Sequence, residues 1–400
     1  MFKNIMLSRA LRKSLSYGNQ LVAGFTGSYC SRLCFHQTAA CKAASRAECG
    51  FKPAKVAVVT KTTRYEFEQQ RYRYAGLSEE DLKQLLALKG SSYIGLLERH
   101  NVHTFNVGQI VDSLQKEGIE VRIVKRGEYD EDTVRWADAI ISAGGDGTML
   151  LVASKVYDKN KPVLGVNTDP ERSEGHLCLP VHYTHAFSEA LQKLRKGEFR
   201  WQWRQRIRMY LEGTGINPTP VDLHELQLSL EQHSKAHRIT TQTQSSTMLK
   251  YKSFKPHLNL SLHRASYYEI SIDDGPWEKQ KSSGLSICTG TGSKAWSYNI
   301  NKLVEQAVED FIESVTETYN ESLIFDPEED KLFFSIREPI VNRVFSNSQQ
   351  RGFAKKVCVR SRCWDACMVV DGGTSFEFND GAIATISLNE EDLLRTVILD

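Results

Sequence analysis

The stretch GGDGT (144–148) follows the apolar run ADAIISA (137–143) and leads into a helix-like sequence. A strand that ends in a glycine turn before a helix presents free backbone N–H groups and the positive end of the helix dipole, which together favour phosphate. Glycines let the backbone approach a diphosphate without obstruction by side chains, and threonine suits a helix N-terminus. The residues predicted to bind phosphate are Gly144, Gly145, Gly147 and Thr148.

Asp146 is the acidic member of this loop. A carboxylate beside phosphates would repel them, so it is better used on a metal ion that bridges the phosphates, or as a base toward an attacking hydroxyl. The loop fits neither G-x-G-x-x-G, which binds dinucleotides in hydride transfer, nor the P-loop G-x-x-x-x-G-K-[ST]. A tight turn in which Asp146 only caps the helix is the structural alternative.

A cysteine-containing stretch, CVRSRCWDAC (358–367), is the other candidate for chemistry. It alternates like a strand, lacks Cys-x-x-Cys spacing and has no accompanying His pair. We therefore expect buried or free thiols of a reducing compartment rather than a metal site. The cysteines beyond residue 50 are Cys178, Cys288, Cys358, Cys363 and Cys367.

Short apolar strands alternate with helices from residue 51 on. The strand candidates are 55–61, 119–126, 137–143 and 161–167, and the helix candidates are 77–101, 107–118, 148–160 and 184–199. Strands that alternate with helices imply a parallel, doubly wound, Rossmann-like sheet. We predict an α/β phosphate-binding domain over residues 51–200.

The hydrophobic period changes to two after residue 200. WQWRQRIRMYLEG (201–213) is typical of a strand with Arg204, Arg206 and Arg208 on one face; they could clamp phosphates, but we expect solvated side chains. Further strands are predicted at 267–272, 285–289, 331–336, 356–360, 367–371 and 382–388, with one amphipathic helix near 293–318. The pattern predicts a β-rich nucleotide-binding domain over 201–390, with a flexible polar insertion at about 231–253 and a C-terminal segment at 391–400.

The first fifty residues form a basic, Ser-containing leader with seven Lys and Arg against one acid. This composition is typical of a mitochondrial transit peptide, and a disordered cytosolic tail is the alternative. Subtracting the leader from the chain's 51 basic and 49 acidic residues leaves 44 and 48, a net charge of −4, which argues against nucleic-acid binding. No run of about 18 apolar residues follows, so no membrane span is predicted.

Four segments together resemble the NAD kinase family. Gly-Gly-Asp-Gly-Thr after a strand is similar to the phosphate-binding loop of a superfamily that includes NAD kinases, diacylglycerol-type lipid kinases and phosphofructokinases. KPVLGVNTDPERSEGHL (161–177) resembles the NAD kinase segment in which Gly-Val-Asn leads to Gly-Phe-Leu, and CTGTGSKAW (288–296) resembles Thr-Pro-Thr-Gly-Ser-Thr-Ala-Tyr. VVDGGTSFEFNDGAIATISL (369–388) resembles the closing Val-Asp-Gly strand pair. The likeness spans residue 55 to about 390 and is greatest to the mitochondrial members of animals.

The resemblance implies a two-domain architecture and transfer of the γ-phosphoryl group of ATP to the 2′-hydroxyl of the adenosine ribose of NAD, giving NADP. Asp146 would activate that hydroxyl or hold Mg²⁺ or another divalent cation. The resemblance also implies at least a homodimer, and with the leader it implies the mitochondrial matrix. The residues it assigns to NAD binding are Asn167, Asn259, Thr289, Thr291, Gly292, Ser293, Ala295 and Trp296.

Some positions depart from the family pattern. The family usually shows Asn-Glu before a strand, whereas Asn259 is followed by leucine, and His224-Glu225 is a rival match that lacks the Asn. Lys294 occupies the place of the second Thr of the signature, and Ser283 that of an Asp. These changes keep open a second hypothesis, a catalytically weak or silent NAD(P)-binding homologue. A lipid kinase is a third, disfavoured because no apolar or basic membrane face is evident.

Overall fold

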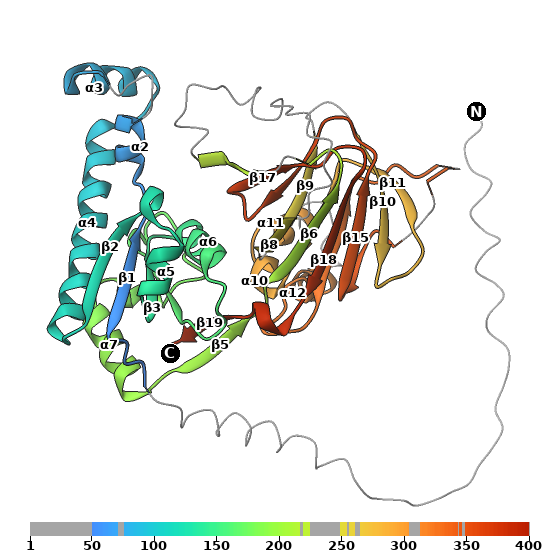
Figure 1. Cartoon of the computed structure of the whole chain (residues 1–400). Helices are drawn as coiled ribbons and strands as arrows, with labels where there is room; N and C mark the ends of the chain where they lie inside the picture. The colour runs from blue at the N-terminus through green and yellow to red at the C-terminus, as the bar shows by residue number, and fades with distance from the viewer. Residues whose placement is uncertain are drawn as a thin grey trace, which may run out of the picture. The chain divides into compact units, whose positions relative to one another are not determined.

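The computed structural model in Figure 1 describes residues 50–70, 76–216, 219–224, 249–253, 256–260, 265–303, 313–342, 344–345 and 349–399. The predicted leader, apart from Gly50, and residues 231–248 of the predicted polar insertion lie outside this described part. Within it, no helix is both long enough and apolar enough to cross a membrane.

The N-terminal part is built on a four-stranded parallel sheet of order β2-β1-β3-β4. Its strands are β1 (Lys55–Thr60), β2 (Glu120–Lys125), β3 (Ala139–Ala143) and β4 (Val163–Val166). Its helices are α2 (Arg64–Gln70), α3 (Glu79–Leu88), α4 (Tyr93–Lys116), α5 (Glu131–Trp136), α6 (Asp146–Lys155) and α7 (Phe187–Lys196), with short 3₁₀ turns η2 (Arg126–Glu128) and η3 (Val181–Thr184).

Both faces of this sheet are covered, which explains why its strands are apolar along most of their length. Val56 and Val58 of β1 pack with residues of α4 and α7, whereas Ala57 and Val59 pack with residues of α5 and α6. Figure 1 shows α4 on one side of the sheet and α5 and α6 on the other. The predicted doubly wound, Rossmann-like sheet is confirmed.

Two helices differ from their predicted lengths. Helix α4 is a single helix that contains most of the predicted helix 107–118 and the end of the predicted segment 77–101. Ser92 Oγ accepts a hydrogen bond from Gly95 N at 3.2 Å at its start, and Gly118 follows its end with a φ of +75°. Helix α6 ends at Lys155, before the predicted end at residue 160.

The C-terminal part is a sandwich of two antiparallel sheets, of order β11-β10-β15-β18-β6-β8 and β14-β13-β12-β9-β16-β17-β7. The strands of the first sheet are β6 (Ile207–Gly213), β8 (Leu249–Ser253), β10 (Ser266–Ile272), β11 (Glu278–Ser282), β15 (Lys356–Ser361) and β18 (Ala382–Leu388). Those of the second are β7 (Val221–Asp222), β9 (Pro256–Leu260), β12 (Gly284–Cys288), β13 (Leu332–Arg337), β14 (Arg351–Ala354), β16 (Ala366–Val370) and β17 (Thr374–Glu377).

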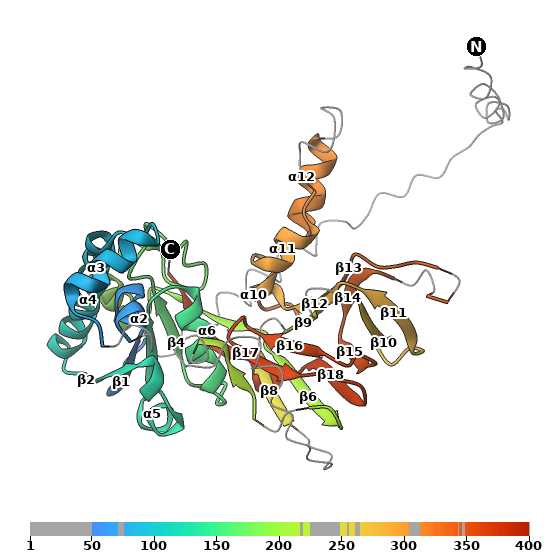
Figure 2. The ribbon, with the colours of Figure 1, turned by 90° about the horizontal axis from the view of Figure 1, so that it is seen from above.

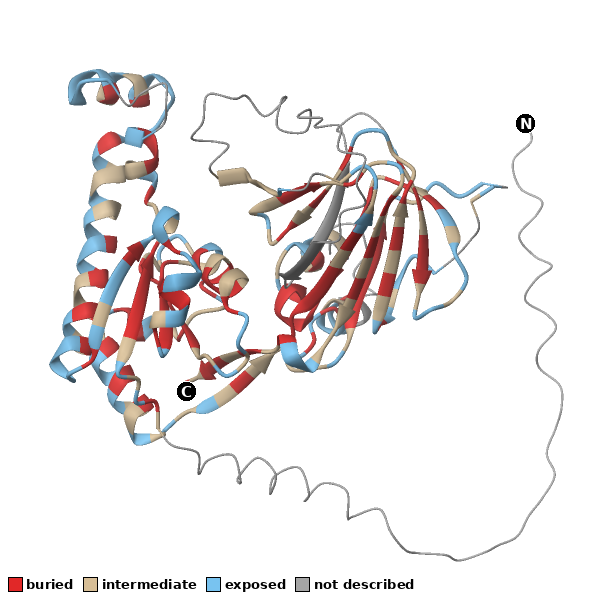
Figure 3. Ribbon diagram, viewed as in Figure 1, coloured by how far each residue is buried: buried red, intermediate tan, exposed pale blue. Residues whose placement is uncertain are grey.

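Alternate residues of the two sheets meet in one core. Met209 and Val359 from one sheet pack in the same cluster as Ile287 and Phe334 from the other. Figure 3 shows buried and less buried residues alternating along β15 and β18, as expected for strands with one face on a core. The predicted β-rich C-terminal part is therefore confirmed.

Two predictions in this part need correction. The single helix predicted near 293–318 is replaced by α10 (Gly290–Ser293), α11 (Trp296–Asn301) and α12 (Glu313–Ser322), and residues 304–312 lie outside the described part; Figure 2 shows α11 and α12 clearly. The last residues of the predicted flexible insertion, 249–253, form strand β8 and pair with β6. The described cysteines are free thiols, as expected.

The predicted strand 201–213 is divided in two. Strand β5 (Arg200–Arg204) ends before β6 begins, and it pairs with β19 (Leu394–Ile398), which follows the 3₁₀ turn η6 (Glu390–Asp392). Leu394 and Val397 pack in the two cores of the α/β part. The segment predicted at 391–400 therefore returns to the α/β part, and β5 belongs with it rather than with the β-rich part.

The expectation of three solvated arginines is wrong. Arg206 is 1% exposed, and its Nη1 donates to the carbonyl oxygens of Ala153 at 2.8 Å and Val156 at 2.6 Å. Arg208 is buried and pairs with Asp392. The chain breaks between β5 and β6, and both side chains point inward. Arg206 donates to carbonyl groups at the C-terminal end of α6, and Arg208 forms ion pairs with acids of η6.

Candidate functional site

The glycine loop joins β3 to α6, with Gly145 as the N-cap residue. A Cβ atom at Gly144 would lie 2.3 Å from Thr148 Oγ1, and one at Gly145 would lie 2.6 Å from Ser173 Oγ. A Cβ at Gly147 would meet no atom within 4 Å, and Gly147 is exposed. Internal packing thus accounts for two of the glycines and leaves Gly147 open to the close approach of a ligand.

Asp146 is the first residue of α6, and its side chain is hydrogen-bonded to the segment that follows β4. Its Oδ1 accepts a hydrogen bond from Leu177 N at 2.9 Å. This bond fixes the carboxylate against the chain that follows β4. Because the N-cap is Gly145, which gives no side-chain cap, and the carboxylate bonds outside its own helix, the structure does not support Asp146 as a mere helix cap.

The second predicted loop, residues 288–296, is held by its own hydrogen bonds. The carbonyl of Thr289 accepts from Gly292 N at 2.9 Å and from Ser293 N at 3.0 Å, and Ser293 Oγ donates to the Gly290 carbonyl at 2.7 Å. A Cβ at Gly290 would lie 2.1 Å from the carbonyl oxygen of Asp326. The turn is therefore packed tightly on the 325–327 segment.

The two loops meet at a small cavity of about 40 Å³. Its lining includes Asp146, His176, Thr291, Gly292, Lys294 and Ala295. A larger cavity of about 500 Å³ shares His176, Leu177, Thr291 and Lys294 with it, and extends over β5 and β19. The structure thus brings Asp146 together with three of the residues predicted to bind NAD.

Arg204 of β5 lines the larger cavity. Its Nη1 donates to Thr291 Oγ1 at 3.4 Å, and its Nε donates to Thr396 Oγ1 at 3.2 Å. Burial lowers the pKa of the guanidinium to about 10, and the charges of Asp146 and Asp326 oppose this shift. The side chain is therefore a cation at neutral pH, close enough to Asp146 to feel its charge.

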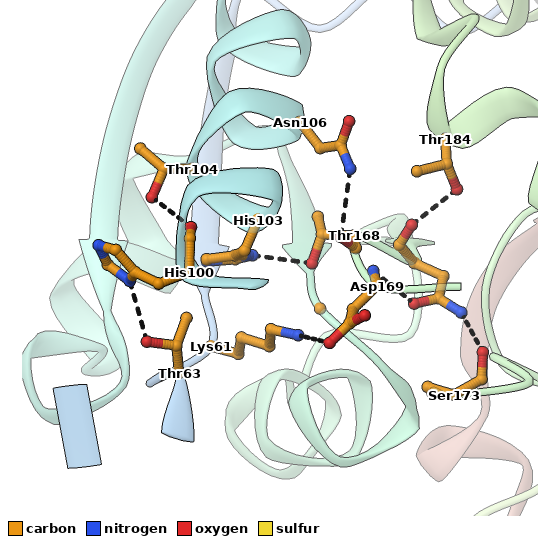
Figure 4. Close-up of polar contacts among 12 residues, drawn as sticks. Lys61, Thr63, His100, His103, Thr104, Asn106, Thr168, Asp169, Ser173 and Thr184 are labelled. Carbon is orange, nitrogen blue, oxygen red and sulfur yellow. Dashed lines mark hydrogen bonds and ion pairs between the residues drawn. The ribbon is translucent and has the colours of Figure 1, made fainter. Parts of the chain in front are cut away.

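A polar cluster lies at the carboxyl ends of β1 and β4, beside the glycine loop (Figure 4). Lys61 Nζ pairs with Asp169 Oδ2 at 3.1 Å, and Lys61 Cβ would contact a Cβ at Gly144 at 3.2 Å. Ligands of open α/β sheets bind outside the carboxyl ends of the strands. Lys61 is therefore a cation placed where phosphates are expected.

Two side chains of α4 contact Thr168 of this cluster, as Figure 4 shows. His103 Nδ1 lies 2.8 Å from Thr168 Oγ1, and Asn106 Nδ2 donates to the Thr168 carbonyl at 3.2 Å. Burial, aided by the charge of Lys61, lowers the pKa of His103 to about 4, so the imidazole is neutral at pH 7. These two contacts fix Thr168, and with it the chain that follows β4, against helix α4.

Other predicted site residues have structural partners. Asn167 donates from Nδ2 to the Ser173 carbonyl at 2.6 Å and accepts from Asp169 N at 3.1 Å. Ser293 Oγ also accepts from Phe325 N at 3.4 Å. Trp296 is 40% exposed, with the Arg337 guanidinium 5.4 Å from its ring centre. None of the three is among the residues that line the two cavities.

Of the departures from the family pattern, Lys294 lines both cavities, and the others are not among the described lining residues. Asn259 lies in β9, where its backbone pairs with Gly284 of β12, and its side chain lies outside the described part. Ser283 Oγ donates to the Arg337 carbonyl at 3.2 Å. The His224 ring lies 5.4 Å from that of Phe67 on α2, and Glu225 lies outside the described residues.

Sequence reasoning missed His176, Lys61 and the inward position of Arg204. Lys61 is the last residue of the predicted strand 55–61, and it directly follows β1 in the structure, so the rule for strand ends could have singled it out. Arg204 stands two residues after Gln202, and the alternation of a strand puts both on one face. That face is the one toward the larger cavity.

Comparison with known families matches residues 56–199 to the ATP-NAD kinase N-terminal domain. The mitochondrial NAD kinase 2 of Xenopus tropicalis is 67% identical over 392 residues, which cover 88% of this chain and 92% of that protein. The human mitochondrial NAD kinase 2 is 68% identical over 382 residues, which cover 89% and 86%.

A solved structure of yeast NADH kinase complexed with NADH has a TM-score of 0.50 and 13% identity, and the match covers 87% of this chain and 84% of that one. This likeness concerns the fold alone. The identities to the vertebrate proteins extend over most of both chains. The chain therefore belongs to the NAD kinase family.

Proposed function

We propose that the protein is an NAD kinase, which transfers the γ-phosphoryl group of ATP to the 2′-hydroxyl of the adenosine ribose of NAD and so forms NADP. The observation that carries this proposal is the small cavity lined by Asp146 from one loop and by Thr291 and Gly292 from the other. Phosphoryl transfer depends mostly on positioning and charge neutralisation, so donor and acceptor loops must meet. The named relatives support the same activity.

We assign the two substrates to the two loops. The donor phosphates fit the glycine loop, Gly144 to Thr148, because its exposed Gly147 and the N-terminus of α6 are open to an anion. We assign the adenine and ribose of NAD to the loop of Thr291, Gly292 and Ala295, and the larger cavity of about 500 Å³, which shares Thr291, has the room that they need. The tightly packed Thr289 and Ser293 would shape this surface.

Asp146 is the residue that we assign to the chemical step. Its Oδ1 is held by Leu177 N, and among the described residues its Oδ2 has no hydrogen-bond partner. A carboxylate fixed in this way can accept the proton of the ribose hydroxyl as that oxygen attacks the phosphorus atom. Its distance and angle to the hydroxyl would be set by the bond to Leu177.

The side chains at this site fit a Mg²⁺ ion that is held mainly by the phosphates of the substrate. Within the described part of the chain no three His, Cys, Asp or Glu side chains gather as a metal site. Mg²⁺ is commonly bound through one or two carboxylates together with phosphates and water, and Asp146 would be such a carboxylate. When bound, the ion would neutralise charge on the transferring phosphoryl group.

We also propose that the protein acts in the mitochondrial matrix, as a homodimer. The basic leader and the mitochondrial names of the vertebrate relatives support the organelle. Expression of the full chain and of residues 51–400, each with the same C-terminal tag, tests the leader, because only the full chain should enter mitochondria. Light scattering on the purified protein should give twice the monomer mass, and the monomer mass would refute the dimer.

One assay separates the candidate activities. The full chain is incubated with ATP, Mg²⁺ and NAD, and NADP is measured by a specific dehydrogenase; NADH and diacylglycerol replace NAD in parallel. Formation of NADP supports the proposal. NAD binding without NADP formation would favour the silent homologue, and phosphorylation of diacylglycerol would favour the lipid kinase.

A further inference from the structure

Arg204 is a cation in the wall of the larger cavity, and within the described part of the chain its guanidinium donates hydrogen bonds only to the hydroxyl groups of Thr291 and Thr396. Among the described residues it forms no ion pair. In the same chain segment, Arg200 lies 3.6 Å from Glu328 and Arg208 pairs with Asp392, whereas Arg206 has no ion pair within the described part but donates to backbone carbonyl groups. A partly buried charge without a counter-charge is costly unless a ligand supplies one.

The acids in the same wall already have partners. Asp326 Oδ1 accepts a hydrogen bond from Glu328 N at 2.8 Å, and Glu174 lies 2.5 Å from His176 Nε2. Lys294 adds a second cation to the lining and is exposed. Among the lining charges that have no ion pair within the described chain, the two cations Arg204 and Lys294 therefore outnumber the one acid, Asp326.

Gln202 provides a buried hydrogen-bond acceptor without a donor at this wall. It lies two residues before Arg204 on the same face of β5, lines the cavity and is 5% exposed. Its Oε1 is buried and accepts no hydrogen bond from the part of the chain that is described. A carboxamide oxygen without a hydrogen-bond donor, beside a guanidinium without an ion pair, indicates a polar ligand that has hydroxyl or amino groups as well as negative charge.

We propose that Arg204 and Lys294 form a subsite in the larger cavity that binds a phosphate group of a nucleotide substrate. The planar fork of arginine can bind two phosphate oxygens at once. Thr291 and Lys294 line both cavities, so this phosphate would lie next to the cavity of Asp146. The inference rests on the proposed function, and it adds residues that the glycine loop does not include.

Binding without turnover tests this subsite. The affinities of the full chain for ATP, for NAD and for adenosine are measured separately by calorimetry, for the wild type and for Arg204→Gln. Loss of a charge-assisted hydrogen bond should weaken ATP or NAD by about 10–100-fold. Adenosine, which has no phosphate, should keep its affinity. Weaker ATP would assign the subsite to the donor, and weaker NAD to the diphosphate of the acceptor.

Arg395→Gln is the matched control. Arg395 lies on the neighbouring strand β19, but its guanidinium is 3.6 Å from the ring centre of Trp201 and is not part of the cavity lining. This variant should bind all three ligands like the wild type. Unchanged ATP and NAD affinities in Arg204→Gln, or an equal loss for adenosine, would overturn the proposal.

Arg204→Lys provides the same test if Arg204→Gln does not fold, because it keeps the charge and loses the fork. It should weaken the phosphate-bearing ligand about tenfold and leave adenosine unchanged. Unchanged binding of both nucleotides by this variant would then overturn the proposal. The outcome is separate from that of the proposed function: a wild type that forms NADP while Arg204→Gln binds normally refutes only the subsite.

Discussion

Gly144→Ala and Gly147→Ala should have opposite effects on stability, although both residues belong to one loop. A Cβ at residue 144 would lie 2.3 Å from Thr148 Oγ1 and 2.9 Å from Thr148 Cβ, and Thr148 is itself buried. Such overpacking costs about 1–3 kcal/mol. At residue 147 the methyl group meets nothing within 4 Å, and alanine in a helix is favoured over glycine by about 0.5–1 kcal/mol.

The same pair tests how the loop is used. If donor phosphates approach the backbone at Gly147, the methyl group of Gly147→Ala occupies space that the phosphate needs. We expect a more stable protein that binds ATP at least tenfold more weakly. Urea denaturation gives the stability of both variants, and calorimetry with ATP in the absence of NAD gives the affinity.

The control separates a blocked site from a damaged fold. Gly90→Ala is not suitable, because Gly90 has a φ of +73°, whereas Gly108 on α4 is a helical glycine with open space around it, like Gly147. Gly108→Ala should gain stability and keep its ATP affinity. Normal ATP affinity and turnover in Gly147→Ala would refute the reasoning that phosphates lie against this part of the loop.

Three further predictions concern single side chains. Asp146→Asn should fold and bind NAD but lose about 10²–10⁴-fold in NADP formation, the range for a general base; near-normal turnover contradicts its assignment. The pKa of His103, about 4 in the folded chain against 6.5 unfolded, should contribute about 3 kcal/mol of stability above pH 6.5 that is lost as the pH falls toward 4. Urea midpoints at pH 7 and 5 should therefore differ less in His103→Gln than in the wild type, and an equal difference contradicts the burial argument. Arg206→Met removes the hydrogen bonds to the carbonyl groups of Ala153 and Val156 and should cost about 2–4 kcal/mol in thermal or urea unfolding, a cost that Arg122→Met on the edge strand β2 should not show.

The local pattern was sufficient for much of the α/β part. Lys55–Thr60 and Ala139–Ala143 are short apolar runs followed by turn and helix sequences, and a strand buried on both faces needs nothing else to be recognised. The glycine loop was predicted for the same reason, because its chemistry lies within five consecutive residues. The loop 288–296, which lies across the cavity, could be predicted only through the family resemblance, because a Thr-Gly-Thr-Gly turn does not by itself indicate a ligand.

The division of residues 200–213 could not be predicted from its own sequence. Apolar residues alternate with polar ones from Trp201 to Leu211 with a single interruption, at Gln205, so the segment is typical of one strand. The partner of β5 is β19, whose residues lie near the other end of the chain, and no local pattern encodes that pairing. The same limit applies to Asp146, whose hydrogen bond to Leu177 spans 31 positions.

The burial of Arg206 connects the two halves of the site. Helix α6 begins at the glycine loop, and at its other end Arg206 binds the carbonyl groups of Ala153 and Val156. The same side chain donates through Nε to the carbonyl of Asp392 at 2.6 Å, just before β19. Because β19 pairs with β5, and β5 carries Arg204 into the cavity, this guanidinium helps to fix the position of Arg204 relative to the glycine loop, together with the packing of Leu394 and Val397 in the α/β cores. Arg206, which the sequence pattern predicted to be solvent-exposed, thus joins the end of α6, which begins at the phosphate loop, to the strands in the opposite wall of the cavity.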